Sequence, residues 1–230
     1  PEVAVAPDLA FSSDRGVILR CFEGGPFQEN AYLVVCPETG VAAAVDPGGG
    51  TSALLETVDQ EGWSLESVLL THAHLDHVDG IPLVRSRYPE VPVFLHPGDR
   101  PVYDAVPEQA SMFGLPVPSL PAGTLDLVPG ESVGVGALEL EVAFAPGHAP
   151  GHVIFLAPES GLALVGDVIF RGSIGRTDLP GGDTATLLAS IREQILPLPD
   201  SMRLFPGHGP DTTVGLERRS NPFVLQMLNG

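Results

Sequence analysis

The stretch 71–80 reads Thr-His-Ala-His-Leu-Asp-His-Val-Asp-Gly and directly follows a short apolar run, residues 68–70. Side chains two positions apart in an extended segment project to the same side, so His72 and His74 present two imidazoles to one ion. Asp76 and His77 lie where the chain turns into a helix, and they point to a second position. This stretch predicts a metal site at the end of a strand.

Three later loops carry the same ligand types, each after an apolar run. They are His148 after residues 138–145, Asp167 after residues 162–165, and His208 after residues 204–205. Because open α/β sheets keep their sites at the carboxyl ends of strands, we expect all these loops at one edge. The sequence thus predicts two ions with Asp167 between them. One ion is bound by His72, His74 and His148, and the other by Asp76, His77 and His208. The catalytic carboxylates are expected to be Asp76 and Asp167.

Imidazole and carboxylate donors together indicate the metal class. These donors favour zinc, with iron or manganese as alternatives, and they argue against calcium or magnesium. The positive charge of two divalent ions exceeds the combined negative charge of two aspartates and one bridging hydroxide. The pocket is therefore expected to be locally cationic.

Short apolar runs alternate with stretches of helical spacing along the chain. This pattern predicts one α/β domain over residues 1–230, with two sheets covered by outer helices in four layers. The stretch 105–123 is expected to be a long irregular loop packed over the site, or else a plain surface connection. Strands are predicted at 17–22, 31–36, 41–45, 68–70, 93–95, 138–145, 153–156 and 162–165, and helices at 52–61, 78–88 and 184–196.

Composition excludes several function classes. The 230 residues include 29 acids and 11 basic residues, all of them arginines, for a formal charge of -18. Without lysine there is no Schiff-base chemistry and no phosphate-loop lysine, and so acidic a surface does not attract nucleic acid or anionic membranes. No apolar run approaches the roughly 18 residues of a membrane span, and residues 1–11 lack the features of a signal peptide. A cytoplasmic location is expected.

Five motifs together resemble the metallo-β-lactamase superfamily, and in particular its small bacterial hydrolases of the glyoxalase II (hydroxyacylglutathione hydrolase) type. They are T-H-A-H-L-D-H at 71–77, P-G-H-A-P-G-H at 146–152, G-D-V-I-F at 166–170, G-R-T-D at 175–178 and P-G-H-G-P at 206–210. The resemblance implies an αββα sandwich, a dinuclear site on the same seven ligands, and thioester hydrolysis. The implied reaction is attack by a metal-bridging hydroxide on a small-molecule substrate such as S-lactoylglutathione.

Recognition of the thiol is less well defined. Arg171 and Arg176 are the arginines nearest in sequence to a ligand, and they would bind a substrate carboxylate. For Arg176 a structural ion pair with Asp178 is the favoured alternative. The physiological thiol and the oligomeric state stay open.

Two other functions compete with hydrolysis. Persulfide dioxygenases of the same superfamily carry a similar G-R-T-D segment and hold a single iron, for which His72, His148 and Asp167 are the counterparts. P-G-H-G-P and the complete second ligand set favour the hydrolase. A non-catalytic member that binds metal or a partner is the third reading, and the intact Asp76 and His208 argue against it.

Two further residues are expected to support the ligands without binding an ion. Asp46 ends a strand at the predicted edge and would orient the metal loop, with a simple turn as its alternative. His152 lies four residues after His148, and because both ligand sets are already full it is expected beside the ligands or in packing.

Overall fold

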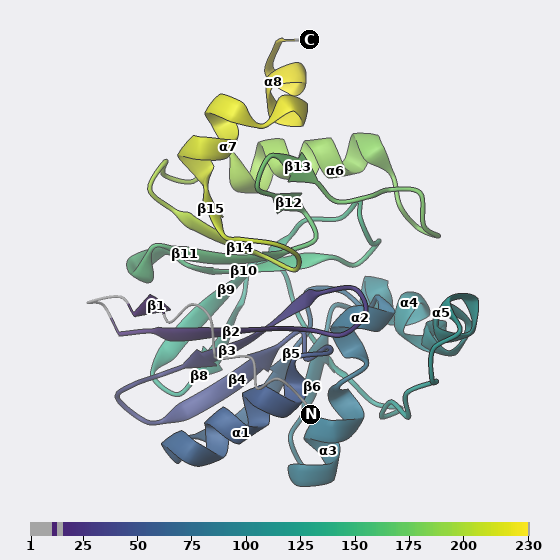
Figure 1. Ribbon diagram of the computed structural model, residues 1–230. Coiled ribbons are helices and arrows are strands. Elements are labelled where there is room, and N and C mark those ends of the chain that lie inside the picture. Colours follow the sequence, from purple (N-terminus) through teal and green to yellow (C-terminus); the bar gives the residue numbers. More distant parts are fainter. Residues whose placement is uncertain (1–10, 13–15, 230) are drawn as a thin grey trace.

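The computed structural model describes residues 11–12 and 16–229. Two mixed sheets lie face to face, and helices cover both outer faces (Figure 1). The expected four-layer αββα sandwich is therefore confirmed. Residues 1–10, most of the segment in which no signal peptide is expected, lie outside the described residues. Among the described helices, none has the length and apolar character needed to cross a membrane.

The first sheet contains seven strands in chain order, antiparallel from β1 to β4 and parallel from β4 to β7. Helices α1 (Thr51–Glu61) and α3 (Ile81–Arg87) lie on its outer face (Figure 1). The strands are β1 (Phe11–Ser12), β2 (Ile18–Gly24), β3 (Glu29–Val35), β4 (Val41–Val45), β5 (Ser64–Leu69), β6 (Val93–Leu95) and β7 (Leu125–Asp126).

The second sheet has the order β15-β14-β11-β10-β9-β8, in which only the β11–β14 pair is parallel. Three helices lie on its outer side: α6 (Thr184–Ser190), α7 (Val214–Ser220) and α8 (Pro222–Asn229) (Figure 1). Helix α6 continues as a π-helical turn at Ile191–Ile195. The strands are β8 (Ser132–Val135), β9 (Leu138–Phe144), β10 (Val153–Ala157), β11 (Leu162–Gly166), β14 (Arg203–Pro206) and β15 (Thr212–Thr213), and β12 (Ile169–Phe170) pairs with β13 (Ser173–Ile174) as a separate ribbon.

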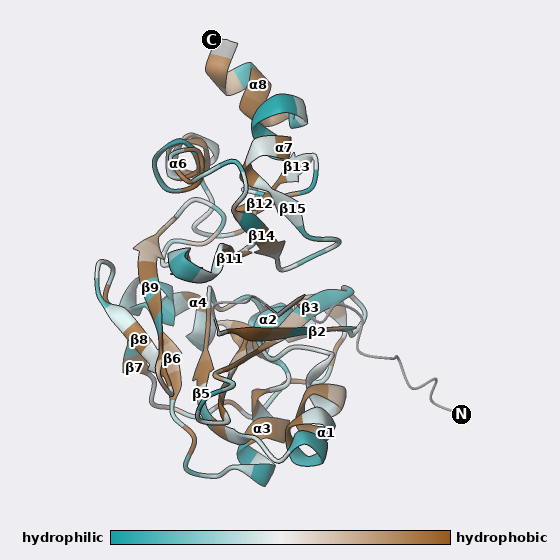
Figure 2. Cartoon of the chain, turned by 90° about the vertical axis from the view of Figure 1, so that its left-hand side faces the viewer, coloured by the Kyte–Doolittle hydropathy of each residue, from teal (hydrophilic) through white to brown (hydrophobic). Residues whose placement is uncertain are grey.

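Three apolar clusters fill the three spaces between the four layers. Leu33 of β3 packs with Leu54 of α1 in the first, and Phe155 of β10 lies between the sheets in the second. Ile154, the neighbour of Phe155, faces α6 in the third cluster. Because both faces of each central strand are covered, strands such as β3 are continuously buried and do not alternate. Figure 2 shows the apolar strands in the interior of the stack.

Two local expectations need correction. The predicted helix 78–88 begins later, as α3, and a separate helical turn, α2 (Leu75–Val78), precedes it, because the backbone at Gly80 packs against the loop after β4. A Cβ at Gly80 would lie 2.1 Å from Thr51 Oγ1, so only glycine fits there. The predicted irregular stretch 105–123 is helical in its first half, as α5 (Val106–Phe113), which follows α4 (Arg100–Asp104).

Candidate metal centre

Parallel pairing brings the polar loops to one edge of the sandwich. β4 and β5 are parallel, so Asp46 and His72 follow neighbouring strand ends. In the second sheet, β11 and β14 are parallel, so Asp167 and His208 do the same. The loop of His148 follows β9, two strands from β11 in the same direction. Residues that are far apart in sequence therefore meet at the predicted edge.

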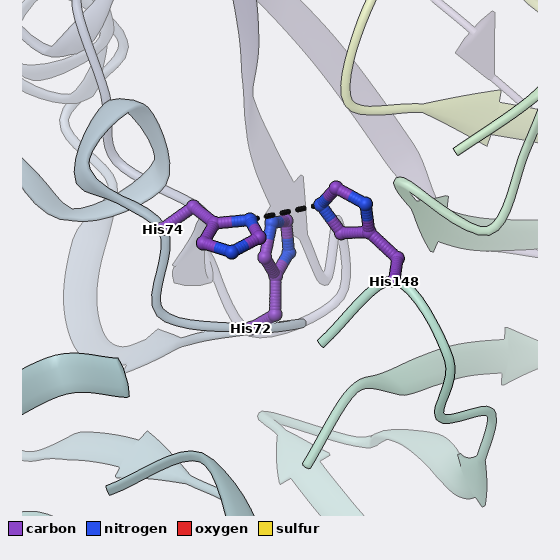
Figure 3. Close-up of side chains that lie close together, drawn as sticks. All are labelled: His72, His74 and His148. Carbon is purple, nitrogen blue, oxygen red and sulfur yellow. Dashed lines mark hydrogen bonds between the residues drawn. The ribbon is translucent and has the colours of Figure 1, made fainter. Parts of the chain in front are cut away.

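The first ligand group consists of His72, His74 and His148, and all three side chains are buried. His74 Nδ1 and His148 Nε2 lie 2.8 Å apart and point to the same spot (Figure 3). The His72 ring stands almost perpendicular to both of the others, with centroids 4.8 Å away. The potential ligand atoms of the group lie within 4.8 Å of one another, as the sequence predicts for one ion.

Asp76, His77 and His208 form the second ligand group. Asp76 and His77 belong to α2, and His208 follows β14 from the other sheet. His208 Nε2 lies 3.2 Å from Asp76 Oδ2, and His77 Nε2 lies 4.0 Å from the same oxygen. Gly207 allows this approach, since a Cβ there would lie 2.3 Å from Asp167 Oδ1.

Asp167 lies between the two groups. Its carboxylate is 3.4 Å from His148 Nε2 on one side. On the other side it lies 3.6 Å from His77 Nε2 and 3.5 Å from His208 Nε2. One carboxylate in contact with both groups is the arrangement expected of a bridging ligand.

Several polar atoms at the centre have no hydrogen-bond partner although they are buried. They are His72 Nε2, His77 Nε2 and Asp167 Oδ1. Because buried polar atoms are almost always paired, these three atoms fit the role of ligands to a bound cation. Imidazole nitrogens and carboxylate oxygens are donors to zinc, iron or manganese, so these residues fit two divalent ions.

Burial sets the charge state of the first group. It holds the pKa of His72 well below its usual value, with the neighbouring His77 and His152 adding to the effect. Burial and the nearby His148 lower the pKa of His74 to about 3. Both rings are therefore neutral, which is the form that binds a metal.

The second group has the opposite electrostatics. Burial disfavours a charge on His77, but the carboxylates of Asp167 and Asp76 prevail and raise its pKa well above the usual value. The pKa of Asp167 is correspondingly held below its usual range, since His77 outweighs the effect of burial. The surroundings of His77 Nε2 thus stabilise positive charge, whether of a proton or of a metal ion.

Asp46, for which an orienting role is predicted, contacts the segment that carries His72 and His77. Its Oδ1 accepts a hydrogen bond from Thr71 N (2.7 Å), and its Oδ2 accepts one from Thr71 Oγ1 (2.6 Å). Oδ2 also lies 3.1 Å from His77 Nδ1. A proton on Nδ1 leaves His77 Nε2 free for an ion. Asp46 itself has a φ of 47°, an uncommon backbone geometry for a residue other than glycine.

His152 lies beside the ligands and outside both groups. Its Nε2 accepts a hydrogen bond from the backbone N–H of Asp167 at 3.1 Å, and its ring stacks on His72 with centroids 4.7 Å apart. His152 therefore contacts the ligand His72 and the backbone of the ligand Asp167. His96, by contrast, accepts from the backbone N–H of Gly98 and lies against Phe144, away from both ligand groups.

Asp99 is a supporting residue that sequence reasoning missed. Its Oδ2 accepts from Ala73 N at 2.6 Å, and its Oδ1 accepts from Gly151 N at 2.8 Å. It therefore joins the two loops that carry the first ligand group. Burial raises its pKa to about 6, although these two N–H groups oppose the shift. In sequence it follows His96-Pro97-Gly98, where nothing indicates a contact with the motif at 71–80.

Glu29 is the second residue that was missed. Its side chain is 1% exposed, its carboxylate lies 4.0 Å from His77 Nδ1, and neither oxygen has a hydrogen-bond partner. Burial raises its pKa well above the usual value. The adjacent Asn30 donates from Nδ2 to the carbonyls of Pro206 and Gly209 and so holds the loop of His208.

A cavity of about 350 Å³ opens onto the ligands, and its lining includes His74, Asp76, His148, Asp167 and His208. Arg176 also lines this cavity, and its guanidinium donates to Asp178 at 2.7 and 2.8 Å, as the favoured alternative expects. The expectation for Arg171 needs correction. Its guanidinium turns outward to the carbonyl of Asp211 and is not part of the lining, because that backbone oxygen offers a local partner.

Helix α5 also contributes to this cavity. Gln109 and Phe113 line it, and Phe113 contacts Phe27 edge to face with centroids 5.1 Å apart. Gln109 Oε1 accepts from Leu75 N, and its Nε2 donates to the carbonyl of Val102, which ties α4 and α5 to α2. The expected packing of the 105–123 stretch over the site is thus found in its helical half.

Comparisons with known proteins agree with this geometry. Hydroxyacylglutathione hydrolase GloC of Haemophilus influenzae is 39% identical over 201 residues, which cover 86% of this chain and 93% of that protein. A crystallised B3 metallo-beta-lactamase superposes with a TM-score of 0.83 at 37% identity, covering 90% of this chain and 99% of the other. A protein solved in a di-iron-bound form superposes with a TM-score of 0.78 at 41% identity, covering 95% and 100%.

Residues 24–208 match the metallo-beta-lactamase superfamily, and this range contains every predicted metal ligand. Its fold, its histidine and aspartate clusters and its relatives agree on one assignment: the chain belongs to the metallo-beta-lactamase superfamily, as a metallo-hydrolase.

Proposed function

We propose that this chain hydrolyses small-molecule thioesters, such as S-lactoylglutathione, at a dinuclear centre. The observation that carries the proposal is the position of Asp167 between two complete ligand groups. The 39% identity to a relative named hydroxyacylglutathione hydrolase supports the substrate class. The relative solved with two irons supports a two-metal centre.

The reaction adds water across the carbon–sulfur bond. The water oxygen bonds to the carbonyl carbon, the C–S bond breaks, and the sulfur leaves with the electron pair and takes up a proton. The products are a carboxylic acid and a thiol. Two divalent ions bound at the seven ligands would activate the water and polarise the carbonyl.

The chain's own residues set the geometry of this reaction. Asp46 holds the ring of His77 by its Nδ1, and His152 holds the backbone of Asp167. Asp76 and Asp167 are the carboxylates that face the cavity, where they would accept hydrogen bonds from the attacking water and orient it. Aromatic side chains of Phe27, Phe113 and Phe170 line the same cavity and reduce access of bulk solvent.

A mononuclear iron dioxygenase is less well supported. Such an enzyme needs only the counterparts of His72, His148 and Asp167. Here a second ligand group also forms from Asp76, His77 and His208. A reaction at a single metal would not require this group. A β-lactam is the second candidate substrate, because a B3 metallo-beta-lactamase is 37% identical with nearly complete coverage of its chain.

The test combines metal analysis with three substrate assays on the purified protein: S-lactoylglutathione, glutathione persulfide with oxygen, and a chromogenic β-lactam. Two metals per chain with release of thiol from S-lactoylglutathione are the expected result. One iron per chain with oxygen uptake would instead identify a dioxygenase. If the β-lactam ring is opened and no thioester is hydrolysed, the β-lactam replaces the thioester as the proposed substrate.

A further inference from the structure

A second cavity adjoins the metal centre. It has a volume of about 330 Å³ and lies between α4, α5 and the loop 179–181. It shares His74, Gln109, Phe113 and Leu179 with the cavity that opens onto the ligands. The two cavities are therefore immediate neighbours across these four side chains, and we name the second one the side pocket.

The lining of the side pocket is predominantly apolar. Val102, Ala105, Met112 and Leu179 contribute aliphatic surface. Glu108 is its only charged lining residue among the described part of the chain, and no arginine faces it. A carboxylate in this space would meet no cation and would be repelled by Glu108, whereas a hydrocarbon group would be stabilised by burial.

The cavity in front of the ligands has the complementary chemistry. Ser173 lines it together with the ligands and offers a hydroxyl to polar groups, while Arg176 lines it with its guanidinium held by Asp178. A thioester placed with its carbonyl at the metals directs its two substituents into different surroundings. The polar thiol then stays in the cavity lined by Ser173 and the ligands, and the acyl group enters the side pocket.

We propose that the side pocket binds the acyl chain, so that the preferred substrates are thioesters with a medium-length aliphatic or aromatic acyl group. This inference rests on the proposed thioester hydrolysis and narrows its substrate class. It places S-lactoylglutathione, with its short hydroxylated acyl group, among the slower substrates. The bond changes are those of the hydrolysis described above.

A series of glutathione thioesters tests the inference with the thiol held constant. For acetyl, butanoyl, hexanoyl and phenylacetyl thioesters, kcat/KM should rise about fourfold for each buried methylene until the side pocket is full. Equal kcat/KM across the series would overturn the inference. A rise that instead follows apolar substituents on the thiol, with acetyl held constant, would also overturn it.

Two variants locate the effect in the side pocket. Ala105 is half-buried in the lining, so Ala105→Phe should fill the space and remove the preference for hexanoyl over acetyl. Ala185→Phe makes the same change on the exposed surface of α6 and should keep the preference. Met112 is 74% exposed, so the Met112→Lys variant should fold normally. The positive charge of the new side chain should make this variant hydrolyse a succinyl thioester in preference to a pentanoyl thioester.

A binding measurement separates this inference from the proposed function. The inert ketone analogues S-(2-oxopropyl)glutathione and S-(2-oxoheptyl)glutathione carry the same acyl groups but cannot be hydrolysed. Calorimetry should show tighter binding of the longer analogue, and Ala105→Phe should remove the difference. If no thioester is hydrolysed but this difference is found, the proposed function fails and the side pocket stands. If thioesters are hydrolysed and both analogues bind equally, only the side pocket fails.

Discussion

The two ligand groups face the same cavity, but different forces prepare them for an ion. His72, His74 and His148 are deeply buried, and desolvation keeps the first two neutral. Asp76, His77 and His208 form a more open group, in which the His208 side chain is 28% exposed. There, negative charge from Asp76 and Asp167 favours a cation at His77.

This difference shows two ways to prepare a metal ligand. Burial removes the competing proton in the first group, and nearby carboxylates raise the affinity for positive charge in the second. The second group should therefore be the more sensitive to loss of a single charge, and Asp167 should be the position on which both groups depend.

Asp167→Ala should have the largest effect, because it removes the carboxylate in contact with both groups. We expect the metal content to fall below one ion per chain and kcat/KM to fall at least about a thousandfold, or about 4 kcal/mol of transition-state stabilisation. Metal analysis and thiol-release kinetics measure the two effects. Glu141→Ala, which removes an exposed carboxylate on β9, should change neither. Retention of two tightly bound ions in Asp167→Ala would show that the groups are independent.

His208→Ala should separate the two groups. The first group keeps all its ligands, so about one ion per chain should remain, while turnover falls about a hundredfold or more because the second ion is lost. Metal titration of the metal-free protein should then show a single binding step. Unchanged turnover would contradict a mechanism that uses both groups.

Asp46→Asn tests the support behind His77. The amide can place an N–H donor toward His77 Nδ1, where the carboxylate now accepts, and this disfavours the ring orientation that frees Nε2. Affinity for the second ion or activity should fall about 10- to 100-fold, with the first ion unaffected. The matched change Asp178→Asn alters a carboxylate outside both ligand groups. A comparable loss of the second ion in that variant would argue against a specific role for Asp46.

Asp99→Asn should have the smallest effect, and it concerns stability. Because burial raises the pKa of Asp99 from 3.8 to about 6, the folded state holds this proton more tightly than the unfolded state. The resulting stability is present below about pH 4 and is lost as the pH rises through 6, by roughly 2 to 3 kcal/mol. Urea unfolding of the metal-free protein at several pH values should show this decline in the parent protein and a flatter profile in Asp99→Asn. Parallel profiles would indicate that Asp99 has an ordinary pKa in the folded protein.

The agreement between sequence and structure is closest for the strands and the metal ligands. Apolar runs such as 41–45 and 93–95 are strands with the same limits, because short buried segments between turn residues have few alternatives. The ligands were recognisable because histidines and aspartates follow such runs repeatedly. The helical part of 105–123 was missed because Pro107, at the start of α5, was counted as a loop residue although proline is well tolerated in a first helical turn.

Contacts across the fold could not be read from the sequence. Asp99 reaches Ala73 and Gly151, and Glu29 lies under His77, but neither belongs to a motif. Arg171 illustrates the opposite error, since its closeness to Asp167 in sequence did not bring it into the cavity. A side chain's direction depends on the partner that folding places beside it, here the carbonyl of Asp211.

By itself, the sequence determined the layered α/β architecture and the chemistry of the ligands, because these follow from local periodicity and from residue types at short spacings. Its five motifs also resembled the superfamily to which the chain belongs. Only the tertiary structure decided the distances within and between the two ligand groups, the placement of Asp99 and Glu29 beside them, and that an apolar side pocket adjoins these groups. The physical reason is that these features arise between loops and helices from distant parts of the chain. Their distances and burial exist only once the two sheets have packed together.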